Sequence, residues 1–492
     1  MNLADERLKE LDNPSLTSDD RALVRCRVAW DFIDKGKYEA AREALGDLWQ
    51  GVGQRPSVET LGDRAAAEVL LLAGALSGWL GASNHVPGAQ ASAKDLISKS
   101  LPLFESLRET WQVAAAQSEL ALCYWRDDAY DEARVLLTAA LGGLSDVVKL
   151  AKAVLRLTTV EFSDGRYNAA LTILKDNAFI FDDRISHALR GNFHNLLALV
   201  LKQLGTTEGR PDYLDRAVIE YTEAIYHQEK AGHERYRATN ENNLANLLRK
   251  MRRYRDAHYH LDRAGAVLLK LKDAGLLAQV DETRARVFID EKKYSEADRV
   301  ITRAVQTLEG GGAAALLAEA LTTQGVVWAG LSRNDESIKV LRRAVKVAED
   351  AGASCVAGLA AVTLIEEHGA RRALSPEEVY EVYVSADRLL KDAQHPEAFA
   401  RLRTCARVVM RRLAGVQFGE KNFTIFNAVH ELEAKLIGQA LDEAGGSVTR
   451  AAKLLGVRHQ TFLSMLNMRH RNLLEKRTPA EKRLKSIIKK GA

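Results

Sequence analysis

The side chains best suited to chemistry lie near the C-terminus, at Arg458, His459, Gln460, Leu463 and Asn467. Their spacing places them on one face of a helix, and that face has about the length that enters the major groove of DNA. Guanidinium, imidazole and amide groups form hydrogen bonds with the edges of bases. The pattern therefore predicts a surface that reads duplex DNA.

Two short helices joined by a tight turn are expected to position this face, within the run GGSVTRAAKLLGVRHQTFLSML. Ser447 or Thr449 can cap the first helix, because a hydroxyl accepts hydrogen bonds from its free N–H groups. Ala451 and Ala452 are small enough to let the second helix cross closely. Gly456 lies where the first helix must stop, a position that often needs a positive φ. The other side of the second helix has apolar residues at a spacing that buries them, namely Val457, Phe462 and Leu466.

These residues resemble the Fis family of bacterial DNA-binding domains over roughly residues 423–472. The resemblance implies that Thr449 and Thr461 contact phosphates and that Arg458 and His459 contact bases. The family pattern is met by Gly446, Thr449, Arg450, Ala451, Ala452, Leu455, Gly456 and Thr461. The full set of residues expected to contact DNA is Thr449, Arg450, Arg458, His459, Gln460, Thr461, Arg469 and Arg471.

The resemblance gives no target sequence, because the family usually has basic residues where this chain has Leu463, Ser464 and Met465. It also implies a homodimer, since Fis-like domains read two half-sites as dimers. The helix expected over residues 424–444 suits a two-fold interface, because it has more apolar surface than one small domain needs to cover. Its apolar residues are Phe426, Val429, Leu432, Leu436, Ile437, Ala440 and Leu441.

Basic charge is concentrated in the same region. From Arg450 to Ala492 there are twelve Lys or Arg residues and two Glu, a net charge of +10, whereas the whole chain has +4. Such a concentration attracts phosphate and makes binding salt-dependent. The alternative is a protein-interaction scaffold whose terminal helices serve only dimerisation or docking. The basic tail favours DNA binding.

Composition predicts a soluble, all-α protein. The 492 residues include only eight prolines, with 47% hydrophobic and 28% charged residues, and no stretch alternates in the way typical of strands. The four cysteines are scattered and suggest a reducing cytosol. The N-terminus does not resemble a signal peptide, and the apolar run from Val69 to Ala82 is too short to span a bilayer. We therefore expect a cytoplasmic, nucleoid-associated bacterial protein.

Most of the chain repeats one motif, an aromatic residue followed three positions later by alanine after a short polar turn. In an αα-hairpin the aromatic closes the turn and the alanine lets the second helix approach the first. The motif resembles the tetratricopeptide repeat over about residues 20–370, so we expect a helical solenoid. Its clearest copies begin at Tyr38, Tyr130, Tyr167, Tyr254 and Tyr294.

In such arrays the first helix of each hairpin lines the concave face. Side-chain amides there can pair with the backbone of an extended peptide. We expect a peptide or protein partner to contact Arg156, Asn195, Asn243, Asn246, Thr283 and Arg286. The alternative is that these are solvated helix residues that hold adjacent hairpins together.

The expected domain order runs from an interaction array to a DNA reader. It comprises an N-terminal segment (1–19), the array (20–370), capping helices (371–414), a linker (415–423), the helix-turn-helix domain (424–478) and a basic tail (479–492).

No catalytic motif accompanies these domains. The sequence has no phosphate-binding G-x-x-x-x-G-K-[ST] loop, no G-x-S-x-G and no H-E-x-x-H. Asp182, Asp183 and His187 could outline a metal site, as could His258 and His260, but surface residues explain both groups better. We expect no enzymatic activity, no cofactor and no metal.

Overall fold

The computed structural model describes residues 11, 13, 15–33, 36–83, 86–311, 313–369, 373–391, 396–413 and 425–477. Within these residues all regular secondary structure is helical, which confirms the predicted all-α class. The chain divides into two compact units, one of residues 1–331 with 392–397 and the other of residues 332–391 with 398–492.

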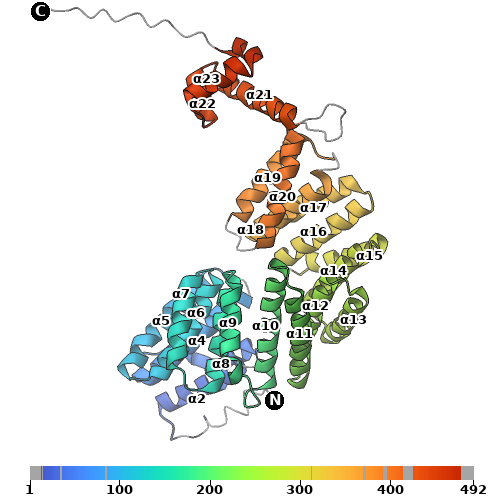
Figure 1. Ribbon diagram of the computed structural model, residues 1–492. Helices are drawn as coiled ribbons and strands as arrows, with labels where there is room; N and C mark the ends of the chain where they lie inside the picture. The colour runs from blue at the N-terminus through green and yellow to red at the C-terminus, as the bar shows by residue number, and fades with distance from the viewer. Residues whose placement is uncertain are drawn as a thin grey trace, which may run out of the picture. The chain divides into compact units, whose positions relative to one another are not determined.

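The first unit is an array of helix pairs, in which each helix packs on its neighbour along the chain (Figure 1). Each pair has an apolar flank that the next pair covers, as the repeat pattern predicts. The helices are α2 (Ser18–Ile33), α3 (Tyr38–Leu45), η2 (Gly46–Leu48), α4 (Asp63–Ser83), α5 (Ala89–Ser106), α6 (Thr110–Arg126), α7 (Tyr130–Gly143), α8 (Val147–Ser163), α9 (Tyr167–Asp176), η3 (Ala178–Ile180), α10 (His187–Thr207), α11 (Pro211–Lys230), α12 (Glu234–Lys250), α13 (Tyr254–Leu271), α14 (Ala274–Asp290), α15 (Tyr294–Glu309) and α16 (Ala314–Gly330).

The aromatic–alanine motif lies where the sequence predicts, at the start of the second helix of a pair. Its aromatic residues, Tyr38, Tyr130, Tyr167, Tyr254 and Tyr294, begin α3, α7, α9, α13 and α15. The alanine three positions later exposes 0% of its surface in all five pairs, at Ala41, Ala133, Ala170, Ala257 and Ala297. Because the spacing of two helices depends on the side chains between them, these alanines permit close packing.

A residue in the left-handed conformation ends the first helix of these pairs, two positions before the aromatic. Gly36 and Gly165 adopt it with φ of 69° and 73°, and Asp128, Arg252 and Lys292 adopt it with φ of 57°, 61° and 63°. This conformation lets the following N–H groups bond to the last free carbonyls of the helix. Glycine is therefore not required at the turn. The aromatic–alanine motif marks the start of the second helix more reliably than a turn glycine does.

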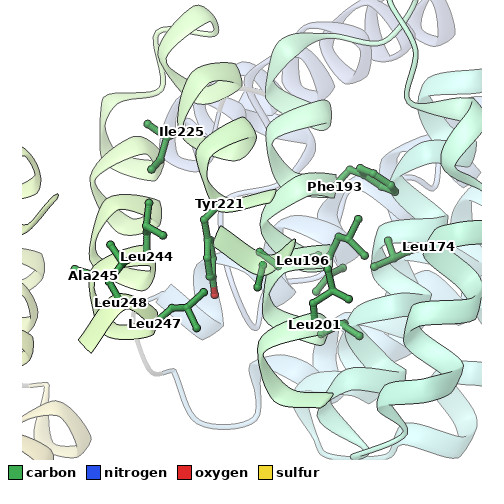
Figure 2. Close-up of a cluster of buried hydrophobic side chains, with 14 of the residues drawn as sticks. Leu174, Phe193, Leu196, Leu201, Tyr221, Ile225, Leu244, Ala245, Leu247 and Leu248 are labelled. Atoms are coloured by element: carbon green, nitrogen blue, oxygen red, sulfur yellow. The ribbon is translucent and has the colours of Figure 1, made fainter. Parts of the chain in front are cut away.

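The largest hydrophobic core extends from α8 to α14. Figure 2 shows Tyr221 of α11 between Leu196 of α10 and the leucines of α12, Leu244 and Leu247. Tyr221 is fully buried, and this burial raises the pKa of its phenol. Three further cores lie among the earlier helices, one across α2 to α5, one across α4 to α6 and one across α6 to α8.

One helix of the array, α4, is long and apolar enough to cross a membrane by length and composition. However, 83% of its most apolar stretch is buried inside the protein. The apolar run from Val69 is therefore part of a core helix, as predicted, although that helix begins earlier, at Asp63.

The second unit contains two groups of helices. Ser375 and Glu378 form a reciprocal capping box at the start of α19. The predicted linker (415–423) and basic tail (479–492) lie outside the described residues, and the predicted domain limits stay predictions. The helices are α17 (Asn334–Asp350), α18 (Ser354–Leu364), the π-helical turn η4 (Ile365–Gly369), α19 (Pro376–Leu390), α20 (Pro396–Leu413), α21 (Ile425–Glu443), α22 (Val448–Leu454), α23 (His459–Met468) and η5 (Arg471–Lys476).

Candidate functional site

The terminal helices α21, α22 and α23 enclose a small core of their own. Ala451 and Ala452 expose 0% and 2% of their surfaces, so α22 packs closely, as predicted. Phe462 and Leu466 are fully buried, which confirms the predicted apolar side of α23. The buried residues are Ile437, Ala440, Leu441, Ala444, Ala451, Ala452, Phe462 and Leu466.

Two glycine-containing turns orient α22 and α23. Gly445 and Gly446 follow α21 with φ of 58° and 79°, and Gly456 separates α22 from α23 with φ of 65°. The N–H after Gly456 donates to the carbonyl of Ala452 at 3.0 Å, which closes the end of α22. The predicted turn glycine is confirmed. The predicted side-chain cap is not formed, because Ser447 precedes α22 but its hydroxyl accepts no capping hydrogen bond.

All eight residues expected to contact DNA are solvent-exposed. Two of them have partners within the domain: Nη1 of Arg469 lies 3.1 Å from Oε1 of Glu433, and Nε of Arg471 donates to the carbonyl of Asn467 at 2.7 Å. These two cations must share or exchange their contacts to reach a phosphate. The other six lie in α22 or at the start of α23, namely Thr449, Arg450, Arg458, His459, Gln460 and Thr461.

The three positions at which the chain departs from the Fis pattern differ in exposure. Leu463 and Met465 are half-buried, and Met465 packs against the domain core. Ser464 is exposed, as is Asn467 one turn later. The outward face of α23 is therefore most polar in its first turn, at Arg458 to Thr461.

Charge is unevenly distributed within this domain. α21 carries four acidic residues and one lysine, whereas residues 444–477 carry seven Lys or Arg and one glutamate. Phosphates attract the second segment and repel the first. The charge pattern thus favours contact with DNA through α22, α23 and the segment after them.

In the first unit, α2, α4, α6, α8, α10 and α12 line a concave cavity of about 1210 Å³, here called the chamber. These are the first helices of their pairs, which are the ones expected on the inner face of the array. Aromatic rings are prominent in the lining: Trp30, Tyr38, Trp79, Trp111 and Tyr236.

Charged side chains lie among these rings. Nζ of Lys149 lies 4.1 Å from the centroid of the Trp111 ring, a cation–π distance. Arg156 donates to Oγ of Ser118 at 2.8 Å and to Oε1 of Glu119 at 2.6 Å, so its guanidinium is fixed. The cations of the lining are Arg27, Arg64, Lys149, Lys152, Arg156 and Arg235, and its carboxylates are Asp31, Glu68, Glu119 and Glu234.

Residues 428–462, which span most of α21, all of α22 and the start of α23, match the sequence family described as "Bacterial regulatory protein, Fis family". The C-terminal domain is a Fis-family helix-turn-helix domain. The match includes both glycine-containing turns and the exposed residues from Arg458 to Thr461. No curated protein matches the chain in sequence.

Solved structures similar to this chain have low sequence identity to it. A Rap protein complexed with Competence and Sporulation Factor matches with a TM-score of 0.50 and 10% identity, over 80% of this chain and 99% of the Rap chain. The apo form of RapI matches with a TM-score of 0.50 and 13% identity, over 79% of this chain and 98% of that one. The apo form of the quorum sensor NprR from B. thuringiensis matches with a TM-score of 0.49 and 14% identity, over 70% and 91% of the two chains. The Rap matches support the tetratricopeptide-like fold of the array.

The Fis-family domain also has an apolar stripe that its own core does not cover. Val429, Leu432 and Leu436 expose 58%, 39% and 46% of their surfaces and share one face of α21. The side chain of Phe426 lies outside the described residues. The other apolar residues expected at a dimer interface, Ile437, Ala440 and Leu441, are instead buried in the domain core.

Of the six residues expected to contact a partner, Arg156 lines the chamber and the other five do not. Asn195 and Asn243 are half-buried. Asn246 accepts a hydrogen bond from Arg249 at 3.2 Å. Thr283 is buried, and Arg286 forms an ion pair with Glu282.

The sequence analysis did not predict the aromatic lining of the chamber. A signal was present, because three of the six tryptophans lie on the first helices of the early pairs.

The two groups first considered as weak metal candidates consist of separate pairs. Asp182 contacts Arg184, Asp183 contacts Arg190 and His187 contacts His227. His258 and His260 face different carboxylates, Glu291 and Glu241. Neither group brings three ligand atoms together.

Proposed function

We propose that this chain is a sequence-specific DNA-binding transcriptional regulator whose repeat array binds a peptide or protein partner. The observation that carries the proposal is the exposed polar turn from Arg458 to Thr461 on the second helix of a Fis-family domain, beside a strongly basic segment. A major groove accepts such a helix, and phosphates neutralise such a charge. The proposal includes a cytoplasmic, nucleoid-associated location and no catalysis.

Binding of the full chain to a random-sequence duplex, followed by fluorescence anisotropy, tests the DNA half of this proposal. Affinity is expected to fall about 10³–10⁵-fold between 50 and 200 mM salt, the loss typical of six to ten phosphate contacts. A chain that leaves anisotropy unchanged at low salt would instead favour the scaffold alternative.

The chamber is the best-supported site for the partner. Its volume of about 1210 Å³ exceeds the usual range for small-molecule pockets, roughly 300–1000 Å³, and suits a short peptide segment. Aromatic rings offer anchors, and fixed cations such as Arg156 offer partners for carboxylates. One similar protein, a Rap protein, was solved with Competence and Sporulation Factor bound. These observations support a peptide with apolar and acidic side chains as the ligand.

Trp111→Ala is expected to weaken peptide binding about 5–30-fold, because removing an aromatic anchor costs on the order of 1–2 kcal/mol. Trp111 is 40% exposed, so the change should leave the fold intact. Peptides selected from a random library on the wild-type chain would be measured by calorimetry against both proteins. Tyr259→Ala, at an exposed tyrosine of α13, is the matched control. The double variant Asn243→Ala with Asn246→Ala tests the alternative site. If it abolishes binding and Trp111→Ala does not, the ligand binds at these two asparagines of α12 and not in the chamber.

Regulation would follow from a difference in ligand affinity between two arrangements of the array. A ligand shifts such an equilibrium only by that difference. In this proposal the bound peptide changes how the paired Fis-family domains are presented to DNA.

A further inference from the structure

A cluster of three metal-ligating side chains lies at one end of the Fis-family domain core. His430 and Glu433 are three positions apart on α21, and His470 follows α23. They continue the stripe of α21 that buries Ile437 and Ala440 further along the helix. On this face of α21, the apolar residues that form the domain core therefore give way to ionisable side chains.

The three side chains are close and already in contact. Nε2 of His470 lies 2.9 Å from Oε2 of Glu433, and the rings of His430 and His470 are stacked with centroids 4.4 Å apart. One ligand atom from each of the three residues lies within 4.8 Å of the other two. His470 is only 1% exposed, whereas His430 faces solvent. The cluster thus combines a fixed inner ligand with an accessible outer one.

This convergence differs from the other histidine–glutamate contacts in the described part of the chain. His194, His258 and His260 each face a single glutamate, which is the arrangement of an ordinary ion pair. At His430, Glu433 and His470 two imidazoles lie near one carboxylate, with their ligand atoms within 4.8 Å of one another. No other group of three or more such side chains converges within the described residues.

We infer that His430, Glu433 and His470 bind a divalent transition-metal ion, with Zn²⁺ as the best match. Two imidazoles and one carboxylate are a common zinc ligand set, with a fourth position left for water. Zinc bonds of about 2.0–2.2 Å place neighbouring ligand atoms about 3.3 Å apart, so the contact between His470 and Glu433 need open only slightly. The ion takes the place of the hydrogen between Nε2 of His470 and Oε2 of Glu433: a neutral imidazole keeps its proton on Nδ1 instead, and an imidazolium releases one proton to solvent.

The surrounding contacts suit this role. Nη1 of Arg469 lies 3.1 Å from Oε1 of Glu433, on the oxygen that does not face His470. An outer hydrogen bond of this kind orients a ligating carboxylate. The bound ion joins α21 to the segment after α23, and thereby fixes the end of the recognition helix. This inference concerns metal binding alone and does not depend on DNA binding.

The test is titration of the reduced, chelator-treated full chain with Zn²⁺ and with Co²⁺ as a spectroscopic probe. The expected result is one equivalent of bound metal and a Co²⁺ spectrum without thiolate charge-transfer bands. His430→Ala and Glu433→Gln are each expected to weaken affinity on the order of a hundredfold or more, since even outer-shell changes cost 10–100-fold. His430 is exposed and Gln is isosteric with Glu, so both variants should fold, as circular dichroism would verify.

His459→Ala, at an exposed histidine of the same domain, is the control and should leave metal affinity unchanged. Absence of binding to the wild-type chain overturns the inference. So does binding that neither His430→Ala nor Glu433→Gln weakens, or a thiolate band that assigns the ion to cysteine.

Discussion

Replacing Leu432 and Leu436 together with glutamate is expected to convert the protein from a dimer to a monomer and to weaken binding to a two-half-site duplex by about 10²–10⁴-fold. Both leucines are exposed on α21, beside Val429 and apart from the residues that form the domain core. A charge placed in an apolar two-fold interface faces its own copy, so repulsion adds to the lost burial. The domain itself should remain folded.

Analytical ultracentrifugation at micromolar concentration and anisotropy on duplexes with one or two half-sites would measure both effects. The affinity of the double variant for a single half-site should change little, because the substitutions on α21 leave the exposed residues of α22 and α23 unchanged. Val135→Glu, at a 69% exposed valine of α7, adds a single negative charge at a remote apolar site and should leave the dimer intact. A wild-type chain that sediments as a monomer and binds DNA one to one would refute the interface.

Arg458→Ala is expected to weaken binding at a preferred DNA site by about 1–3 kcal/mol, or roughly 5–150-fold, with much less effect on random DNA. Arg458 precedes α23 and is exposed, so a bidentate contact with a base is sterically open to it. The preferred site would be obtained by selecting random duplexes on the wild-type chain.

Arg450→Ala is the informative comparison, because a lost phosphate contact weakens binding evenly and flattens the salt slope by about 0.9. Lys435→Ala removes an equal charge from the acidic helix α21 and should alter neither quantity. If Arg450→Ala and Arg458→Ala both leave affinity unchanged, α23 is not the recognition helix.

The elements of this protein follow from local sequence patterns. The five aromatic–alanine motifs mark the start of second helices, and the buried alanines confirm the reason for their spacing. Gly456 marks the turn between α22 and α23, and Phe462 and Leu466 mark the buried side of α23. Hydrophobic periodicity and the residue preferences of turns depend on residues close together in the chain. They can therefore be recognised in a single sequence.

Tertiary structure decided which side chains share a surface. Trp30 and Tyr236 line the same chamber although about 200 positions separate them, because the successive pairs curve around it. The packing of α21 also decided which of its apolar residues are buried in the core and which form the exposed stripe. The positions of these residues in the sequence do not distinguish the two sets.

The contact between Glu433 and His470 also depends on tertiary packing. Glu433 lies on α21 and His470 lies between α23 and η5, and only the fold of α21 against the segment after α23 brings their side chains within 2.9 Å. The sequence by itself determined the helices, their turns and the polar face of α23. Their tertiary packing determined the chamber, the exposed apolar stripe and the histidine cluster, because each depends on contacts between residues distant in the chain.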